Sequence, residues 1–378
     1  MKNLGFLILC LGCMKTAAHA DNAPSPLSAA GSSALQPPVR TLPQATLSPG
    51  REESILSLEG HRTSSQQSTE SESDRKKRLS SLKERALSAA VMFGGLVFWL
   101  DTFREPGLIV LVWFLQFRLY QEGTNVVLSN KELKEKGISS IKWLWFVAYD
   151  LALVGPRLLE RKRDGSPLLS ASSIYLCSFA LVAFGLVSFV INLNNSMAFS
   201  YEFQGALQEM ALYHLAIALV VVPSSFWIAT IQDFGMSYAL YSLYLVIIND
   251  IMAYIAGVCF GKHPLLPSIS PKKTWEGFIG ALLSTMAISV YLWRAMGLEI
   301  IAGGDRSVVH PLVIAAFCSL VAPFGGFLAS IVKRAHGKKD FSSFIPGHGG
   351  IIDRLDCQLV AAPFMYLYLK RFVMPWKQ

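Results

Sequence analysis

Residues 236–260 read MSYALYSLYLVIINDIMAYIAGVCF, and this stretch decides the class of fold. A helix needs about 20 consecutive apolar residues to cross the hydrocarbon core of a bilayer. The stretch is long enough, and Asp250 is its single charged residue. It therefore predicts a membrane-spanning helix that carries one acid near its end.

The same pattern recurs on both sides of this stretch. From about residue 86 onward, apolar blocks alternate with short polar connections. The blocks predict an all-α, polytopic transmembrane protein with about 8–9 membrane helices. Several early blocks are shorter than a usual span, so their exact number stays open. The predicted spans are 86–102, 107–120, 143–157, 168–192, 207–230, 236–260, 277–297, 309–332 and 355–375.

The composition excludes most other classes of protein. Of 378 residues, 52% are hydrophobic and only 16% are charged, and the mean hydropathy is +0.40. Soluble domains carry roughly 25% charged residues, so a soluble enzyme and a disulfide-rich secreted module are excluded. The net charge of +8 is spread between the apolar blocks, which is typical of basic loops facing anionic lipid. Because it forms no single basic stripe, no nucleic-acid partner is predicted.

Residues 1–85 differ from the rest of the chain. Residues 1–20 predict a signal peptide, because Lys2 precedes an apolar run and Ala18-His19-Ala20 is a small-x-small cleavage pattern. A short membrane-proximal helix is the alternative. Residues 21–85 are rich in Ser, Pro, Gln and Glu and predict a disordered leader, since they cannot bury enough apolar surface to offset chain entropy. The transmembrane domain is therefore expected over residues 86–378.

The basic loops indicate how the domain is oriented. Residues 262–273 and 333–348 are both basic and are separated by two predicted spans. They are therefore expected on the same side of the membrane, and the excess of positive charge makes that side cytosolic. In this scheme, the basic cluster at 161–163 falls on the opposite side of the membrane, and so does the residue that would follow a cleaved signal peptide. Either one of the short spans or the signal peptide is therefore wrongly predicted.

Charged residues at the edges of apolar spans are costly and are therefore functional candidates. Asp250, after Asn249, is the first, with a hydrogen bond to a neighbouring helix as the structural alternative. The second is SPKKTWEG at residues 270–277, where Pro271 is expected to fix a turn. Lys272 and Lys273 would then project at the membrane surface, where such residues also serve as plain helix anchors.

The richest cluster runs from residue 330 to residue 356. Asp353 and Asp356 are three residues apart, so on a helix they share a face and could present oxygens to one hard cation such as Mg²⁺. The glycine-rich segment 346–350 lets backbone amides approach an anion just before a helix begins. Four cations accompany the two acids: Lys333, Arg334, Lys339 and Arg354.

A site of this composition suits a polyphosphate substrate bound with Mg²⁺. Nucleotidyl or phosphoryl transfer fits best, because its catalysis is mainly positioning and charge neutralisation. His348 could act as a general base, or more modestly as a hydrogen-bond donor to phosphate. Neither a Ser-His-Asp arrangement nor an activated cysteine is evident, so a covalent intermediate is not implied.

Three ordered motifs over about 110 residues, within 249–357, resemble the phosphatidate cytidylyltransferase (CDP-diacylglycerol synthase) family. They are the Asn249-Asp250 motif, the 270–277 motif and the 330–356 cluster, and 323–327 resembles the eukaryotic branch. The resemblance implies that CTP and phosphatidic acid react to give CDP-diacylglycerol and pyrophosphate. It also implies Mg²⁺, a polytopic fold in the lipid bilayer and a homodimer.

The resemblance also implies roles by position. Bacterial members carry an acid where this chain has Gly326, so the ligand set of those members does not transfer in full. The implied metal ligands are Asp353, Asp356 and Asp250. The implied catalytic residues are Asp353, Asp356, Lys333, Arg334 and His348, and the implied substrate-binding residues are Lys272, Lys273, Ser330, Lys339, Asp340, Arg354, Gly349 and Gly350.

Other functions and locations stay open. A CTP-dependent polyprenol kinase, a CDP-alcohol phosphotransferase and a non-enzymatic transporter are the alternatives. The phosphotransferase would need a D-G-x-x-A-R core, which the chain lacks. A transporter would carry ionisable residues in mid-span on several helices, whereas here only Asp150 and Asp233 do so, and structural hydrogen bonds would explain both. The endoplasmic reticulum membrane is the expected location, with a plastid or other organelle membrane as the alternative.

Overall fold

The computed structural model describes residues 94–126, 138–159, 170–196, 200–302, 307–338, 340–344 and 349–374. The chain divides into two units, Met1–Ala90 and Val91–Gln378, and every described residue belongs to the second. The predicted signal peptide and leader lie outside the described residues.

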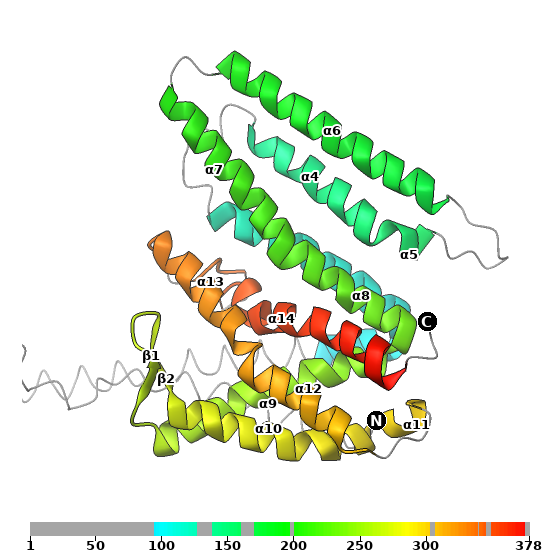
Figure 1. The fold of residues 1–378 in the computed structure, drawn as a ribbon, viewed down its shortest axis with the longest axis vertical. Helices are drawn as coiled ribbons and strands as arrows, with labels where there is room; N and C mark the ends of the chain where they lie inside the picture. The colour runs from blue at the N-terminus through cyan, green and yellow to red at the C-terminus, as the bar shows by residue number, and fades with distance from the viewer. Residues whose placement is uncertain are drawn as a thin grey trace, which may run out of the picture. The chain divides into compact units, whose positions relative to one another are not determined.

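The described part is built almost entirely from helices, as predicted (Figure 1). After the helical segment 94–126, the longer helices pack as neighbouring pairs, above all α9 with α10, α4 with α6, α10 with α12, and α14 with α8 and α13. The elements are α4 (Ile138–Leu153), α5 (Gly155–Leu159), α6 (Ala171–Ser196), α7 (Ser200–Ala216), the π-helical turn η1 (Ile217–Val221), α8 (Val222–Phe234), α9 (Met236–Phe260), β1 (Pro264–Leu266), β2 (Ser270–Thr274), α10 (Trp275–Ala295), α11 (Leu298–Ile301), α12 (Val309–Leu320), α13 (Pro323–Ala335), α14 (Ile352–Tyr368) and the π-helical turn η2 (Leu369–Val373).

Within the described residues, five helical stretches are long and apolar enough to cross a membrane. Three of them are α6, α9 and α10, taken over most or all of their length. The other two join neighbouring elements, Gly205–Phe234 through η1 and Val309–Ala335 through a short turn. This arrangement confirms an all-α polytopic membrane protein.

Two predicted boundaries need refinement. In the described residues, the predicted spans 86–102 and 107–120 belong to one helical segment, 94–126, within which Arg104 has a φ of +50°. A positive φ is costly for an L side chain. The predicted span 309–332 is two helices, because Pro323 can occupy the first turn of α13 but could not continue α12.

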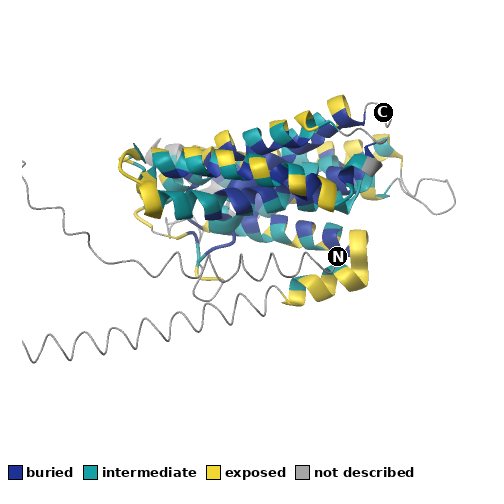
Figure 2. Cartoon of the chain, turned by 90° about the horizontal axis from the view of Figure 1, so that it is seen from below, coloured by how far each residue is buried: buried dark blue, intermediate teal, exposed yellow. Residues whose placement is uncertain are grey.

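The exposed apolar side chains follow the membrane interpretation. On α6, Leu176 and Phe179 are each 69% exposed, while Ile174 and Phe189 on the same helix are buried. Figure 2 shows this division on many helices, with buried residues facing their neighbours and exposed ones facing outward. The exposed rows are the surface that lipid would cover.

A two-stranded antiparallel ribbon, β1 with β2, joins α9 to α10, and the sequence did not predict it. Pro271 lies within β2, so its predicted role of fixing a turn is wrong; the turn lies at 267–269, where Ile269 N donates to Leu266 O. The Glu276 carboxylate accepts from the backbone amides of Lys262 and His263 and anchors the entry to the ribbon.

Helices α9 and α10 approach closely because small residues line their contact. A Cβ on Gly277 would lie 2.7 Å from Ala253 O, and one on Gly280 would lie 2.5 Å from Ala256 Cβ. The Thr274 hydroxyl accepts from Gly277 N and caps the start of α10. These contacts hold the second half of α9 against the start of α10.

Candidate active site

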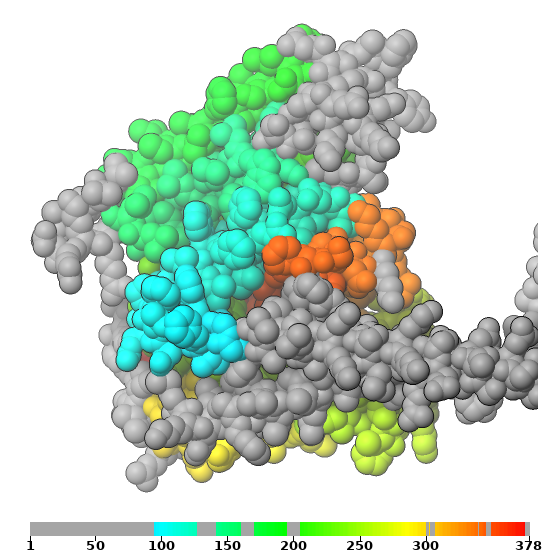
Figure 3. Space-filling model, turned by 180° about the vertical axis from the view of Figure 1, so that it is seen from behind, coloured from blue at the N-terminus to red at the C-terminus, as the bar shows by residue number. Residues whose placement is uncertain are grey.

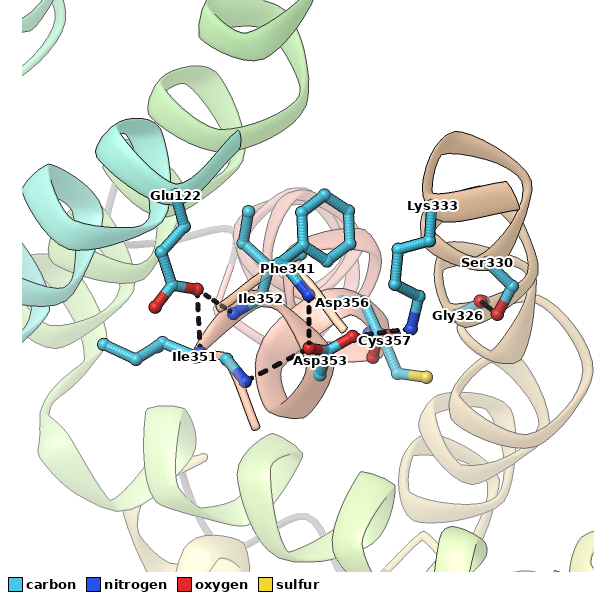
Figure 4. Close-up of polar contacts among 11 residues, drawn as sticks. Glu122, Gly326, Ser330, Lys333, Phe341, Ile351, Ile352, Asp353, Asp356 and Cys357 are labelled. Carbon is cyan, nitrogen blue, oxygen red and sulfur yellow. Dashed lines mark hydrogen bonds and ion pairs between the residues drawn. The ribbon is translucent and has the colours of Figure 1, made fainter. Parts of the chain in front are cut away.

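The site forms where the end of α13 meets the start of α14. The two helices approach closely beneath it, since a Cβ on Gly325 would lie 2.3 Å from Asp356 O. On this scaffold, Lys333 in the last turn of α13 reaches Asp353 in the first turn of α14, with 2.6 Å between Nζ and Oδ1 (Figure 4). Both side chains are largely buried, so the ion pair is shielded from solvent.

The second oxygen of Asp353 holds the preceding loop. Asp353 Oδ2 accepts from Phe341 N at 3.0 Å and from Gly350 N at 3.1 Å. The Phe341 ring also lies 5.7 Å from Lys333 Nζ. One carboxylate therefore joins α13, the 340–344 stretch and the start of α14.

Asp356 brings the other two motifs into the same site. Its Oδ1 accepts from the amide of Cys357 at 2.8 Å. Asp250 from α9 and Lys273 from β2 both lie close enough to act electrostatically on the Asp356 carboxylate. Lys273 Nζ also stands 4.3 Å from the centre of the Phe327 ring on α13. The three sequence motifs therefore converge at one place.

Arg334 ties the two predicted basic loops together. Its Nε donates to Ile269 O in the turn of the ribbon at 3.1 Å. The 262–273 and 333–338 segments therefore meet at the same end of the helices, as the parity of the spans predicted. Which side of the membrane this end faces stays a prediction.

The remaining predicted residues have different environments. The Ser330 hydroxyl donates to Gly326 O within α13, while Lys272 is exposed on β2 and Arg354 lies in the first turn of α14. Gly349 has a φ of +84°, and a Cβ there would lie 3.5 Å from Asp340 Oδ1. Lys339 and His348 lie outside the described residues.

Glu122 is a site residue that the sequence reading missed. It is 4% exposed, on the helical segment 94–126, and its Oε2 accepts from Ile351 N at 2.8 Å and Ile352 N at 3.1 Å. Its Oε1 accepts from the Ser342 hydroxyl at 2.7 Å. Figure 3 shows this segment in cyan beside the orange surface of the C-terminal helices. The only available signal was an acid just beyond a predicted span.

An open hollow of about 310 Å³ lies next to Glu122, between 341–344 and the helical segment, where Arg118, Gln121 and Asn125 line it. The Arg118 guanidinium stacks on the Phe344 ring at 4.1 Å. The hollow is polar on the helix side, and one of its walls, Phe341, is bonded to Asp353.

The two mid-span acids are explained by structural contacts. Asp150 accepts from Trp113 Nε1 at 2.8 Å and from Gln116 Nε2 at 2.7 Å. Asp233 accepts from Arg157 and from the Tyr366 hydroxyl, each at 2.9 Å. These hydrogen bonds bear out the structural explanation of the two acids.

The fold and the site define a polytopic helical membrane protein with a cluster of acids and lysines at one end of its helices. The chain belongs to the cytidylyltransferase family, whose model matches residues 83–372. It is 30% identical over 339 residues to phosphatidate cytidylyltransferase of Caenorhabditis elegans. The aligned region covers 76% of this chain and 71% of that protein.

Other relatives align over a shorter region. The chain is 36% identical over 235 residues to phosphatidate cytidylyltransferase 1 of Arabidopsis thaliana, covering 52% of this chain and 54% of that protein. It is 34% identical over 239 residues to phosphatidate cytidylyltransferase 1 of Homo sapiens, covering 52% of this chain and 50% of that protein. The match therefore spans about half the length of these two relatives. The predicted family resemblance is confirmed.

Proposed function

We propose that this chain transfers a cytidylyl group from CTP to phosphatidic acid and releases CDP-diacylglycerol and pyrophosphate. The observation that carries the proposal is the convergence of Asp250, Lys273 and Asp356 beside the Lys333–Asp353 pair, in a chain of the cytidylyltransferase family. The plant, worm and human relatives are all named phosphatidate cytidylyltransferase.

The reaction needs positioned charge more than a proton-transfer residue. A phosphate oxygen of phosphatidic acid attacks the α-phosphorus of CTP, a new P–O bond forms, and the bond to the leaving pyrophosphate breaks. The attacking phosphate monoester is already ionised near neutral pH. Lys272, Lys273 and Arg334, from β2 and the end of α13, would neutralise the negative charge that builds up.

We further propose that Mg²⁺ is the cofactor and that Asp250 and Asp356 hold it. Two neighbouring carboxylates repel each other, and a divalent cation would relieve that repulsion. A Cβ on Gly326 would lie 3.3 Å from Asp356 Oδ2, so the glycine leaves space beside this oxygen. When bound, Mg²⁺ would polarise the phosphate oxygens of the substrate.

Asp353 is the third predicted metal ligand. Its carboxylate is held by Lys333 and two backbone amides, so it would have to exchange one of these donors for the metal. Among the described residues, no group of three or more His, Cys, Asp or Glu side chains is placed to hold a metal ion. This does not oppose Mg²⁺, which commonly takes one or two carboxylates and completes its shell with water and phosphate.

The direct test uses the purified full chain in mixed micelles with labelled CTP, with and without phosphatidic acid. We expect CDP-diacylglycerol and pyrophosphate in equal amounts, only when both substrates and Mg²⁺ are present. EDTA should abolish the reaction, and excess Mg²⁺ should restore it. Asp353→Asn and Lys333→Ala should each remove turnover; near-normal turnover in both would refute the assignment.

Location and oligomeric state are finer proposals. We propose the endoplasmic reticulum membrane, supported by the signal-peptide pattern of residues 1–20, and a homodimer, supported by the family resemblance. Imaging an N-terminally intact fusion tests the first, with a plastid or other organelle membrane as the alternative outcome. Mass measurement of the purified protein in a small nanodisc tests the second.

A further inference from the structure

The start of α14 is held in an unusual way. A helix N-terminus leaves its first backbone N–H groups without partners in the helix, and a polar side chain at the N-cap commonly accepts from one of them. Here the N-cap residue is Ile351, which has no side-chain oxygen and makes no capping bond. The amides of Gly350, Ile351 and Ile352 are nevertheless all bonded, and their acceptors are two carboxylates.

The two carboxylates accept hydrogen bonds from different amides at the start of α14. Asp353, inside the first turn of α14, accepts from Gly350 N, and Glu122, 230 residues before Ile352, accepts from Ile351 N and Ile352 N. Each also accepts from the 341–342 stretch, Asp353 from Phe341 N and Glu122 from the Ser342 hydroxyl. The start of α14 and this stretch are therefore clamped between two acids (Figure 4).

Gly350 shows how closely the clamp fits. A Cβ at this position would lie 2.9 Å from Glu122 Oε2, 3.0 Å from Asp353 Oδ2 and 3.1 Å from Ser342 N. Real Cβ atoms rarely lie this close to neighbouring heavy atoms, so a side chain would push at least one carboxylate away. The glycine at this position lets both acids reach the backbone of α14.

We propose that Glu122 is a positioning residue for the reaction: it caps α14 from a distant helix and thereby holds Asp353 against Lys333. Glu122 donates no atom to the chemistry. Its carboxylate fixes where α14 begins, and that position sets the 2.6 Å contact between Asp353 Oδ1 and Lys333 Nζ. The negative charge also suits the positive end of the helix dipole.

The proposal predicts different effects for two substitutions of Glu122. Glu122→Ala removes the acceptor for three donors and lets the start of α14 shift. A displacement of about 1 Å near a reacting group can lower turnover about 10²-fold, so we expect that loss in kcat with a small change in KM for CTP. Glu122→Gln keeps an oxygen for the two amides and an NH₂ that can donate to Ser342, so it should recover most of kcat.

Cys357 provides a readout that does not depend on activity. It lies in the second turn of α14, is 6% exposed, and should be protected from a maleimide. Cys318 on α12, 1% exposed, is the internal reference in the same protein. Labelling quantified peptide by peptide should show faster modification of Cys357, relative to Cys318, in Glu122→Ala than in the wild type or Glu122→Gln.

A matched control is available in another buried glutamate. Glu209 on α7 is 5% exposed and accepts from the Tyr213 hydroxyl of the same helix. Glu209→Ala should lower thermal stability while leaving kcat within about threefold of the wild type and Cys357 protected. If removing any buried acid were enough to lower kcat and expose Cys357, Glu122→Ala and Glu209→Ala would both show these effects.

The inference rests on the proposed function, and its outcomes separate the two. Wild-type protein without turnover, combined with exposure of Cys357 in Glu122→Ala, would reject the proposed function and keep the capping role. With an active wild type, three results would each overturn the inference: kcat of Glu122→Ala within threefold of the wild type, a loss of kcat with Cys357 still protected, or Glu122→Gln no better than Glu122→Ala.

Discussion

Helix α6 and the α13–α14 pair differ in what holds their side chains. Helix α6 carries no charged residue, and residues such as Leu176 and Phe179 face outward over much of its length. In the α13–α14 pair, Lys333, Asp353 and Asp356 are bound by side chains and backbone amides from several segments. Lipid requires only an apolar surface of α6, whereas the polar atoms of the pair are held by specific side chains and backbone amides.

This difference implies a gradient of sensitivity. Outward positions on α6 should accept many apolar side chains, because lipid adapts to their shape. Positions in the α13–α14 pair should accept few substitutions, because an altered atom leaves a buried donor or acceptor unpaired. The predictions below test this gradient from the largest expected effect to the smallest.

Asp356→Asn should have the largest effect. It removes one of the two acids proposed to hold Mg²⁺, and metal contributions of several kcal/mol correspond to a loss of about 10²–10³-fold in turnover. The measurement is the rate of CDP-diacylglycerol formation across a Mg²⁺ titration. Asp233→Asn is the control, since Asp233 accepts from Arg157 and from Tyr366, which lies at the opposite end of α14 from Asp356. Equal losses in both variants would contradict the proposed metal-holding role of Asp356.

Gly350→Ala should come next. The added Cβ would meet Glu122 Oε2 at 2.9 Å and Asp353 Oδ2 at 3.0 Å, so we expect turnover to fall by about 10–10²-fold through displaced catalytic groups. The assay is steady-state kinetics with CTP varied. Gly95→Ala serves as the control, because a Cβ there has nothing within 4 Å. An unchanged kcat in Gly350→Ala would show that the two acids are not held tightly.

Local pattern was enough to predict much of the fold. The predicted span 236–260 coincides with α9, and 277–297 lies within two residues of α10 at each end. These helices are long and apolar, and their boundaries are marked by glycine and by the polar ribbon between them. The convergence of Asp250, Lys273 and Asp356 was also expected, since the family resemblance linked their motifs.

Contacts between distant segments were not predictable from such patterns. Glu122 meets Ile351 and Ile352 across more than 200 residues, and no period in either segment indicates the pairing. The ribbon was missed because SPKKT contains a proline and two adjacent lysines, whereas strands favour β-branched and aromatic residues. In both cases the surrounding structure supplies the partners that the local sequence lacks.

Gly277→Ala should mainly affect stability. Its Cβ would lie 2.7 Å from Ala253 O and 3.2 Å from Gly257 Cα, so α9 and α10 would have to separate. Overpacking of this kind costs about 1–3 kcal/mol. A lowered unfolding temperature in detergent is the expected result, with turnover reduced less than in Gly350→Ala. If turnover fell while the unfolding temperature stayed unchanged, the glycine would instead belong to the site.

The smallest effect is expected on the outward face of α6. Leu176→Ala changes a side chain that is 69% exposed, so the unfolding temperature and turnover should stay near wild-type values, within about 0.5 kcal/mol of stability. Phe189→Ala on the same helix is the contrast, since Phe189 is 4% exposed and packs in the core with Trp145 and Phe146. Removing a buried ring costs about 3–5 kcal/mol in a protein core, and most of that packing loss should persist in a bilayer because the cavity remains.

Equal stability of the two variants would mean that α6 is held by lipid alone. A large loss in Leu176→Ala would mean that its outward face contacts another protein surface, and the contrast between α6 and the α13–α14 pair would then have to be redrawn.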